Sequence, residues 1–374
     1  MNISETEAPV SQTQNFNDQN KIQQFMNKAI QDIAGSSTAM LVIIGHRLGL
    51  YRAMAQANNQ FSVKELADKT GTIERLLREW LGNQVASGYI EYDPRSRKYT
   101  LPPEHALALA DENSPIYLQG IFKAIKSYFK DEEEFLKMFR GERTLSWMDH
   151  NPLMAEGFAE FFKSGYIGNL INSWIPAVDN GNILEKLKKG VKVADVGCGF
   201  GITTLMMAKA YPKSTFTGFD FDKESITKAK ESAKKENIYN VKFEVSSASE
   251  FPGSSYDFVT FFDCLHDMGD PEGALTHARN VIKKDDVDSD SDKGTCMIVE
   301  PFAQNELENN VNPVASTFYA STLICVPNSL AFNGPALGAQ AGENRIKDVV
   351  MKSGFSHFKR VLETPLNIIY EAKP

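Results

Sequence analysis

The chain has 374 residues, of which 42% are hydrophobic and 24% charged, which is the composition of a globular protein large enough for two domains. The net charge of −8 argues against a protein that binds nucleic acid through its overall charge. The four cysteines lie far apart in the sequence without metal-type pairing, so we expect reduced thiols, no metal site and a cytoplasmic protein.

The N-terminal residues predict a tail and then helices. Residues 1–20 are rich in Asn, Gln, Ser and Thr, which is typical of a disordered tail. No apolar core follows a basic start, and the apolar run 39–44 is too short to span a bilayer, so neither a signal peptide nor a membrane partner is expected. Residues 21–57 carry apolar side chains at helical spacing and predict two helices broken near Gly35. Their apolar content favours a homodimer through the N-terminal domain.

Residues 61–100 have the order of a winged helix. A short helix closed by Gly71 precedes a second helix that Thr72 is expected to cap. Two strand-like pieces follow Gly88 and predict the wing. Seven Lys or Arg stand against six Asp or Glu in this stretch, so we expect no nucleic-acid partner and a structural or dimerising role. We place this domain at residues 21–110.

Aromatic-rich helical segments fill the next stretch, residues 111–186, which we interpret as a linker and a lid. From residue 187 to 374, strand-like and helix-like segments alternate, which predicts an α/β fold with a mostly parallel, doubly wound sheet. The sequence thus predicts an α-helical winged-helix domain followed by a Rossmann-like domain.

The stretch VKVADVGCGFG, residues 191–201, predicts a buried strand, a glycine turn and the start of a helix. Such a turn lets a ligand lie directly on the backbone. Ile202 stands where the dinucleotide fingerprint needs its third glycine, which argues against an NAD oxidoreductase. Asp195 lies within the apolar strand, where its charge would repel a pyrophosphate but suit a cationic ligand.

The ends of the other predicted strands add polar and aromatic groups to the same rim. Ligands of open α/β sheets bind outside the carboxyl ends of the strands. Asp220, at the end of the second strand, can bond ribose hydroxyls, and Phe221 can stack on a base. Asp263 and Glu300 follow at later strand ends and make the rim acidic. The remaining candidates for ligand binding are Ser247, Ala248 and Phe262.

The segments VADVGCGFG, GFDFD and FFDCLHDMGDP, with IVEPF, NPV…FYASTLICVPNSL and GAQAGE, closely resemble the class I S-adenosylmethionine-dependent methyltransferases. The chain is most similar to the bacterial-type small-molecule methyltransferases with an N-terminal winged helix. The resemblance covers residues 25–374 and implies a seven-stranded sheet whose last strand is antiparallel.

The resemblance also implies S-adenosyl-L-methionine as the cofactor and assigns its binding residues. It puts Asp195, Gly197 and Gly199 along the methionine end and Asp220 on the ribose. It puts Phe262 and Asp263 beside the sulfonium. The adenine is assigned to Phe221, Ser247 and Ala248.

The acceptor is expected to be a small aromatic or hydrophobic molecule. We place its pocket between strand ends four and five, the lid and the segment 312–339. The aromatic candidates for its walls are Phe158, Phe161, Phe162, Tyr166, Trp174, Phe318, Tyr319 and Phe332. Few polar groups then remain to orient or deprotonate an acceptor, namely Asp263, His266 and Glu300.

His266 is the candidate base, and the alternative is a structural histidine bonded to Asp267 or Asp270. Gly273 occupies the place of the catalytic histidine in plant-type O-methyltransferases, so a mechanism based on that histidine is not expected. No NPPY or DPPY motif follows strand four, which argues against nucleic-acid N-methylation. Two alternatives stay open: a winged-helix regulator that senses a ligand through a methyltransferase-like domain, and an inactive scaffold.

Overall fold

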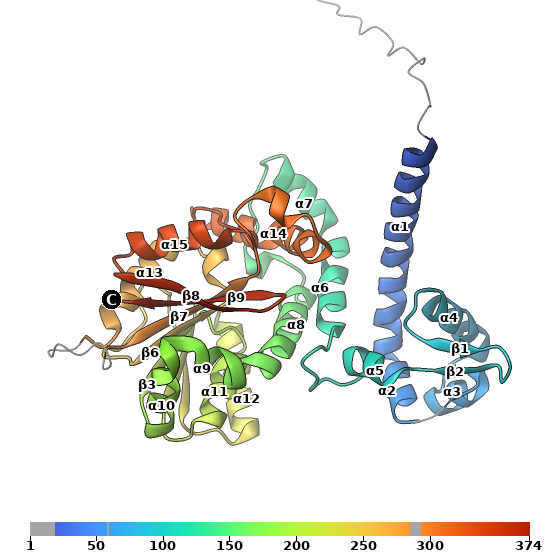
Figure 1. Ribbon diagram of the computed structural model, residues 1–374, viewed down its shortest axis with the longest axis horizontal. Coiled ribbons are helices and arrows are strands. Elements are labelled where there is room, and N and C mark those ends of the chain that lie inside the picture. The colour runs from blue at the N-terminus through green and yellow to red at the C-terminus, as the bar shows by residue number, and fades with distance from the viewer. Residues whose placement is uncertain (1–18, 58–59, 285–292) are drawn as a thin grey trace, which may run out of the picture. The chain divides into compact units, whose positions relative to one another are not determined.

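The computed structural model describes residues 19–57, 60–284 and 293–374, and the chain divides after His105 into two compact units (Figure 1). Most of the predicted tail, residues 1–18, lies outside the described residues. No described helix is both long and apolar enough to cross a membrane.

The first unit contains the predicted helices and the wing. Its elements are α1 Gln19–Arg47, α2 Leu50–Ala55, α3 Val63–Thr70, α4 Glu74–Ala86, β1 Glu91–Asp93 and β2 Lys98–Thr100. Ser62 and Glu65 form a capping box at the start of α3, and Gly71 ends it in the left-handed conformation. The two strands pair antiparallel, with Glu91 opposite Thr100. The predicted winged-helix order is confirmed.

Two local predictions for this unit were wrong. Helix α1 runs through Gly35 without a break, because nothing lies near that position to disturb it and one glycine costs a long helix only about 1 kcal/mol. The chain turns instead at Gly49, with φ 69°. Thr72 does not cap α4, because its hydroxyl lies 2.9 Å from the hydroxyl of Thr70, and Ile73 occupies the cap position without a side-chain bond.

The second unit is built on a seven-stranded sheet with the order β5-β4-β3-β6-β7-β9-β8. Its strands are β3 Lys192–Val196, β4 Thr215–Asp220, β5 Val241–Val245, β6 Phe258–Phe262, β7 Thr295–Pro301, β8 His357–Glu363 and β9 Asn367–Lys373. The first five of these are parallel, whereas β9 is antiparallel to both of its neighbours. The predicted seven-stranded sheet with an antiparallel last strand is confirmed.

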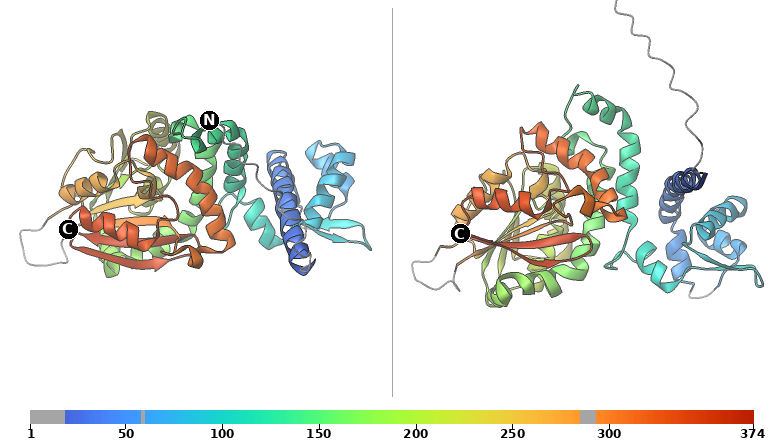
Figure 2. Two further views of the ribbon diagram at one scale, coloured as in Figure 1. Left: turned by 90° about the horizontal axis from the view of Figure 1, so that it is seen from above. Right: turned by 45° about the horizontal axis from the view of Figure 1, so that its top comes forward.

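Helices cover both faces of the sheet (Figures 1 and 2). Alternate residues of β7 show why: Cys296 and Ile298 belong to the core on one face, and Met297 and Val299 to the core on the other. The first core receives α13 Pro271–Val281 and α15 Gly342–Lys352. The second core receives α10 Asn182–Lys189 and α11 Ile202–Ala210, while α12 Lys223–Glu236 packs beside β5. Parallel strands buried on both sides explain the continuous apolar runs of the sequence.

The segment predicted as a lid is mainly helical and belongs to the same compact unit as the sheet. Its helices are α6 Gln119–Lys130, α7 Glu132–Phe139, α8 Leu153–Asn169 and α9 Ile175–Ala177, with a π-helical turn at Leu170–Trp174. Helix α5 Pro103–Leu109 precedes this segment, and the division between the two units falls within it. Helices α6 and α8 approach so closely that Gly120 and Gly157 face each other's backbones without room for a side chain. One further helix, α14 Pro313–Ala331, follows β7 and is capped by the side chain of Asn312.

Candidate functional site

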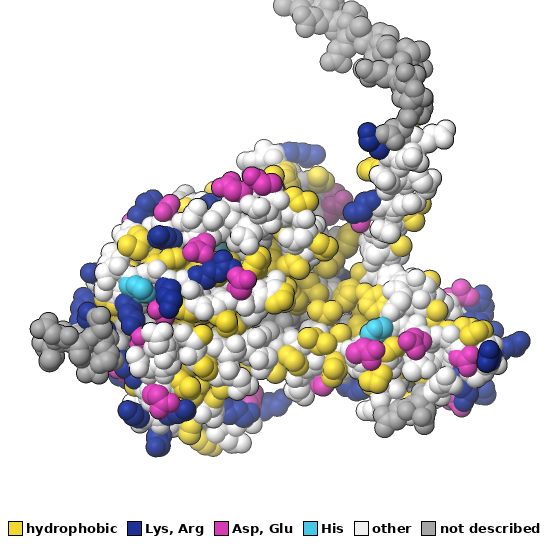
Figure 3. Space-filling view, viewed as in Figure 1, with side chains coloured by type: hydrophobic (Ala, Val, Ile, Leu, Met, Phe, Trp, Pro, Cys, Tyr) yellow, Lys and Arg dark blue, Asp and Glu magenta, His cyan; other side chains and the backbone are white. Residues whose placement is uncertain are grey.

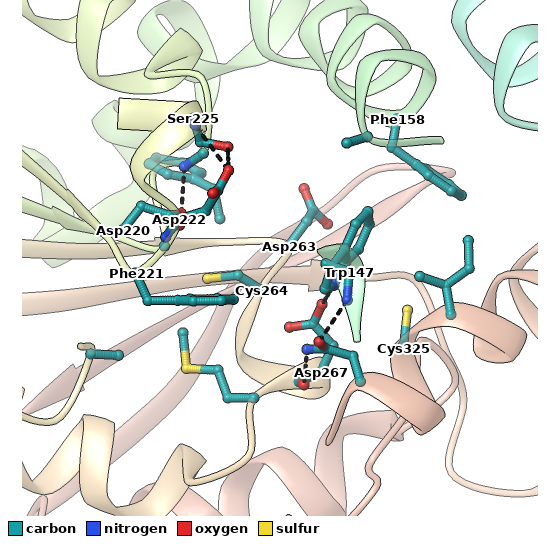
Figure 4. A pocket seen from close by; sticks show the side chains of 18 of the residues that line it. Trp147, Phe158, Asp220, Phe221, Asp222, Ser225, Asp263, Cys264, Asp267 and Cys325 are labelled. Carbon is teal, nitrogen blue, oxygen red and sulfur yellow. Dashed lines mark hydrogen bonds between the residues drawn. The ribbon is translucent and has the colours of Figure 1, made fainter. Parts of the chain in front are cut away.

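A cavity of about 740 Å³ lies at the carboxyl ends of the central strands (Figure 4). Two groups of residues line it. The strand-end half comprises Gly197, Gly199, Asp220, Phe221, Ser247 and Ala248. The aromatic half comprises Trp147, Phe158, Phe162, Tyr166, Phe318 and Cys325. Phe262, Asp263 and His266 also line the cavity.

The glycine turn joins β3 to α11 in a conformation that side chains would not allow. Gly197 and Gly199 have φ values of 72° and 50°, in the left-handed region. A Cβ on Gly197 would lie 2.7 Å from Cys264 Sγ, whereas one on Gly199 would meet nothing within 4 Å. The backbone at Gly199 is therefore open to a ligand in the cavity.

Asp220 at the end of β4 holds this turn in place. Its carboxylate accepts hydrogen bonds from the backbone N–H groups of Gly199 and Asp222, at 2.8 and 2.9 Å. Burial raises the pKa of this carboxyl, although both hydrogen bonds oppose the shift. The backbone of Phe221 also acts on this carboxylate as a donor, and with three donors on its four lone pairs the group can still accept a hydroxyl donor from a ligand.

Asp195 is the one residue assigned to the cofactor that does not line the cavity. Its buried carboxylate accepts hydrogen bonds from the hydroxyls of Thr203, Thr204 and Thr260, at 2.7, 2.6 and 2.9 Å. Burial raises its pKa to about 6. The first two hydroxyls belong to the first turn of α11, so Asp195 ties that helix to the sheet, and any effect on a ligand would pass through the glycine turn.

Asp263 lies where the two halves of the cavity meet. It follows β6 with φ 50°, and its carboxyl accepts hydrogen bonds from Tyr166 Oη and Asn367 Nδ2, both at 2.8 Å. Burial and the nearby charge of Glu300 raise its pKa to about 8. At neutral pH this group is therefore mostly a neutral carboxylic acid.

The structural alternative required a bond from His266 to Asp267 or Asp270. The ring is bonded instead to Glu300. Its Nδ1 lies 2.6 Å from Glu300 Oε2, and its Nε2 lies 3.2 Å from Cys325 Sγ. Glu300 itself does not line the cavity and also accepts the N–H of Leu265 at 3.0 Å. Burial lowers the pKa of His266, but the charges of and hydrogen bonds to Glu300 and Cys325 together outweigh this effect and raise the pKa well above 6.5.

Most of the predicted aromatic walls are present. Phe158, Phe162 and Tyr166 are stacked along α8, with successive centroids 6.0 and 6.3 Å apart. Phe318 and Phe332 also line the cavity. The prediction was wrong for three aromatics that the cavity does not include, namely Phe161, Trp174 and Tyr319. Trp174 lies in the π-helical turn that follows α8 and is fully buried in the second core of the sheet.

Sequence reasoning missed several residues of the site. Six acidic side chains line the cavity, and the rim expected from strand ends contained only two of them, Asp220 and Asp263. The others follow the strands in a short 3-10 helix or at the starts of α12 and α13, namely Asp222, Glu224, Asp267 and Asp270. Among the described residues that line the cavity, Lys228 is the single lysine or arginine. The excess of acids gives the cavity a negative character that suits a cation.

Family models match both parts of the chain. A methyltransferase domain matches residues 187–314, and an Rv2258c-like winged HTH domain matches residues 36–111. These matches confirm the methyltransferase domain and the winged helix expected from the motifs.

Known proteins support the same assignment. An uncharacterised methyltransferase of Schizosaccharomyces pombe is 30% identical over 134 residues, which is 32% of this chain and 48% of that protein. The chain thus spans about half the length of the curated relatives it matches. Among solved structures, a putative O-methyltransferase from Nostoc punctiforme aligns with a TM-score of 0.69 at 19% identity, over 93% of this chain and 98% of that one.

Human N-acetylserotonin methyltransferase, solved in complex with S-adenosylmethionine, aligns with a TM-score of 0.68 at 15% identity, over 97% and 99% of the two chains. At such identities the likeness shows the fold. Together with the family models, it shows a methyltransferase domain preceded by an Rv2258c-like winged helix-turn-helix domain, in a fold that the chain shares with solved methyltransferases.

Proposed function

We propose that the protein transfers a methyl group from S-adenosylmethionine to a small, planar, largely apolar molecule. The observation that carries this proposal is one continuous cavity with two different halves. The strand-end half offers open backbone and carboxylates, and the aromatic half offers rings and few polar groups. A cationic nucleoside and an apolar acceptor would therefore meet near Asp263.

The residues of the strand-end half fit S-adenosylmethionine. The open backbone at Gly199 and the remaining acceptor capacity of Asp220 suit the amino acid and ribose groups, and Phe221, 47% exposed, offers a face to the adenine. Ser247 and Ala248 would border the adenine edge, and Phe262 and Asp263 the sulfonium. When bound, this cofactor supplies a methyl group on a positively charged sulfur, and that sulfur is a good leaving group in an in-line displacement.

The chain's own contribution is then alignment and the exclusion of water. Phe262 packs edge-on against Tyr166, with centroids 5.7 Å apart, and the hydroxyl of Tyr166 donates a hydrogen bond to Asp263. These contacts fix an apolar wall and a polar anchor at the point where the halves join. The protonated carboxyl of Asp263 adds no full negative charge there.

For an acceptor that must lose a proton, we propose that His266 takes it at Nε2, with Glu300 holding the ring. Because the pKa of His266 is raised, the imidazole is free to accept a proton only at pH values well above 6.5. We expect turnover to rise toward alkaline pH in the wild type. Replacing His266 with Gln should lower turnover while the affinity for S-adenosylhomocysteine stays within about twofold, since a base acts on the reaction and not on cofactor binding. An unchanged pH–rate profile in this variant would remove His266 from the mechanism.

Calorimetry tests the cofactor assignment, and isotope transfer tests the reaction. S-adenosylhomocysteine should bind and NAD should not. Incubation with S-adenosylmethionine carrying a trideuteromethyl group and a panel of planar phenols, enols and aromatic amines should give a product heavier by the labelled methyl group in mass spectrometry. If S-adenosylhomocysteine fails to bind, the proposed function is wrong.

The winged helix favours a structural role over the regulator alternative. On α4, Arg75 pairs with Glu79 and Arg78 with Glu74, so the exposed arginines are neutralised by acids of the same helix. Its outer face also carries Ile73 and Leu76, 67% and 66% exposed. This surface offers little to a phosphate backbone, and we propose no nucleic-acid partner. A gel shift with sequence-selective, sub-micromolar DNA binding would contradict the proposal.

We also propose a homodimer through α1 and a cytoplasmic location. Apolar side chains on α1 remain exposed at three- and four-residue spacing, some of them visible in yellow in Figure 3. Phe25 and Ile33 are 70% and 67% exposed. A second copy of the same helix would cover such a stripe. The four cysteines are all unpaired, which supports a reducing compartment.

A further inference from the structure

The segment Ser146–Asn151, between α7 and α8, lies beside the aromatic half of the cavity. We call it the strap. Trp147, Met148 and His150 of the strap line the cavity. The carboxylate of Asp149 accepts hydrogen bonds from the backbone N–H and the hydroxyl of Ser146, at 2.8 and 2.7 Å, which fixes the strap's first residues as one tight turn.

One end of the strap is attached to the helices that precede it. His150 Nδ1 lies 3.3 Å from Asp131 Oδ2, and the N–H of Asn151 donates to the same oxygen at 3.0 Å. Burial lowers the pKa of His150, so at neutral pH an uncharged imidazole makes this contact with the Asp131 carboxyl group. These two bonds hold the end of the strap that leads into α8 against Asp131.

Trp147 attaches the other end to the wall of the cavity. Its backbone N–H donates to Asn328 Oδ1 at 3.1 Å, and its indole N–H donates to Asp267 Oδ2 (Figure 4). Asn328 Nδ2 in turn donates to the backbone carbonyl of Asp267 at 2.9 Å. Three segments far apart in the sequence, the strap, the turn after β6 and α14, are thus joined at one point.

These bonds also define what Trp147 presents to a ligand. Because Asp267 uses the only donor of the indole, the rest of the ring offers an apolar surface. The ring meets Phe158 edge-on, with centroids 6.1 Å apart at 80°. Trp147 therefore continues the aromatic wall of α8 at an angle and limits the width of the cavity for a planar molecule.

We propose that Trp147 is a specificity-determining residue of the acceptor site, and that the strap must release Asp267 and Asn328 for an acceptor to enter. That the entering molecule is a methyl acceptor rests on the proposed function, whereas the control of entry by the strap does not. Releasing the strap would leave the buried carboxylate of Asp267 without its indole partner, which costs free energy, so the attached state is favoured in the absence of a ligand.

The thiol of Cys325 reports entry into the cavity. It is 6% exposed and lines the aromatic half, whereas Cys296 lies fully buried in β7. Alkylation of each cysteine in the intact chain can be followed by peptide mass spectrometry. The test compares the wild type with Trp147→Phe, which loses the indole donor, and with Met148→Leu, a matched change of the neighbouring strap residue that makes no bond to Asp267 or Asn328.

Two alkylating reagents of different size distinguish release of the strap from a change in the width of the cavity. Trp147→Phe should speed alkylation of Cys325 by iodoacetamide at least fivefold, and by the larger, planar N-phenylmaleimide by a still greater factor. Met148→Leu should leave both rates within twofold of the wild type. Hydrogen exchange of the backbone amides of residues 146–149 should rise in Trp147→Phe in parallel with alkylation.

Three results would overturn the proposal: equal Cys325 rates in Trp147→Phe and the wild type, the same acceleration for both reagents, or equal acceleration at Cys296, which would indicate general loosening. Asn328→Ser, which shortens the second attachment, provides the same comparison if Trp147→Phe does not fold. None of these readouts needs methyl transfer. S-adenosylhomocysteine binding is measured on the same variants. Loss of that binding would count against the proposed function, whereas the alkylation rates alone decide the proposal about the strap.

Discussion

Asp220 holds the glycine turn through Gly199 N–H and is the residue that the proposed function assigns to the ribose. Asp220→Ala should weaken binding of S-adenosylhomocysteine by roughly 1.5–3 kcal/mol, the range for hydrogen bonds to a charged group. Glu224→Gln is the matched control, since Glu224 lines the same rim and pairs only with the partly exposed Lys228. Titration calorimetry checks both variants, and equal affinities for Asp220→Ala and the wild type would remove the ribose assignment.

Asp263 predicts an unusual dependence of stability on pH. Its pKa is about 8 in the native state and about 3.9 in an unfolded chain, so between these values the native state holds a proton that the unfolded state lacks. The free energy of unfolding should therefore fall as the pH rises from 6 to 8, by at most ~1.4 kcal/mol per pH unit from this group. The raised pKa of His266 acts in the same direction.

Urea unfolding followed by tryptophan fluorescence measures this effect. Asp263→Asn should flatten the slope between pH 6 and 8. Asp222→Asn should not change the slope, because burial raises the pKa of Asp222 but hydrogen bonds from Ser225 and Glu224 outweigh it, so that this group titrates below the window. A wild-type midpoint that rises across the window would contradict the prediction.

At the scale of elements, the strands were predictable and the loops between them were not. The apolar runs of β3, β6 and β7 and the glycine turn identify themselves by local pattern, and Asp220 and Asp263 by their place at strand ends. Trp147 meets Asp267 and Asn328 across 120 and 181 residues of sequence, and no periodicity marks such a contact. Sequence placed Glu300 correctly at a strand end but could not show that it lies behind His266.

Helix α1 illustrates how a single residue misled the prediction. Glycine lowers helix propensity everywhere, but its effect depends on what surrounds it. Position 35 is open on all sides, whereas a Cβ at Gly45 would lie 2.4 Å from the Trp80 ring. Propensity alone treats the two glycines alike, and only the packed structure separates them.

The two glycines therefore form a matched pair. Gly35→Ala should stabilise the chain by about 0.5–1 kcal/mol, because alanine favours the helix without a clash. Gly45→Ala should destabilise it, since the Trp80 ring must move. Thermal unfolding by circular dichroism compares the two melting temperatures with that of the wild type. A loss of stability in Gly35→Ala would show that the open position is occupied by a partner.

At the scale of the whole molecule, the exposed stripe on α1 predicts the oligomeric state. Replacing both Phe25 and Ile33 with Glu should convert a dimer to a monomer, because two buried charges per copy oppose association. Tyr239→Glu is the control, since Tyr239 is 86% exposed on the methyltransferase unit and lies outside the stripe. Light scattering gives the masses, and a dimer that survives the double substitution would place the interface elsewhere.

Helix α14 has a consequence for how this protein could change its substrate. Five of its residues line the cavity from one face of the helix, namely Phe318, Ser321, Ile324, Cys325 and Asn328. None of the residues assigned to the cofactor lies on it. Under the proposed function, substitutions confined to α14 would therefore change one wall of the acceptor half while the residues assigned to the cofactor stay intact. A laboratory library confined to positions 318, 321 and 324 would explore new acceptors without risking the strand ends.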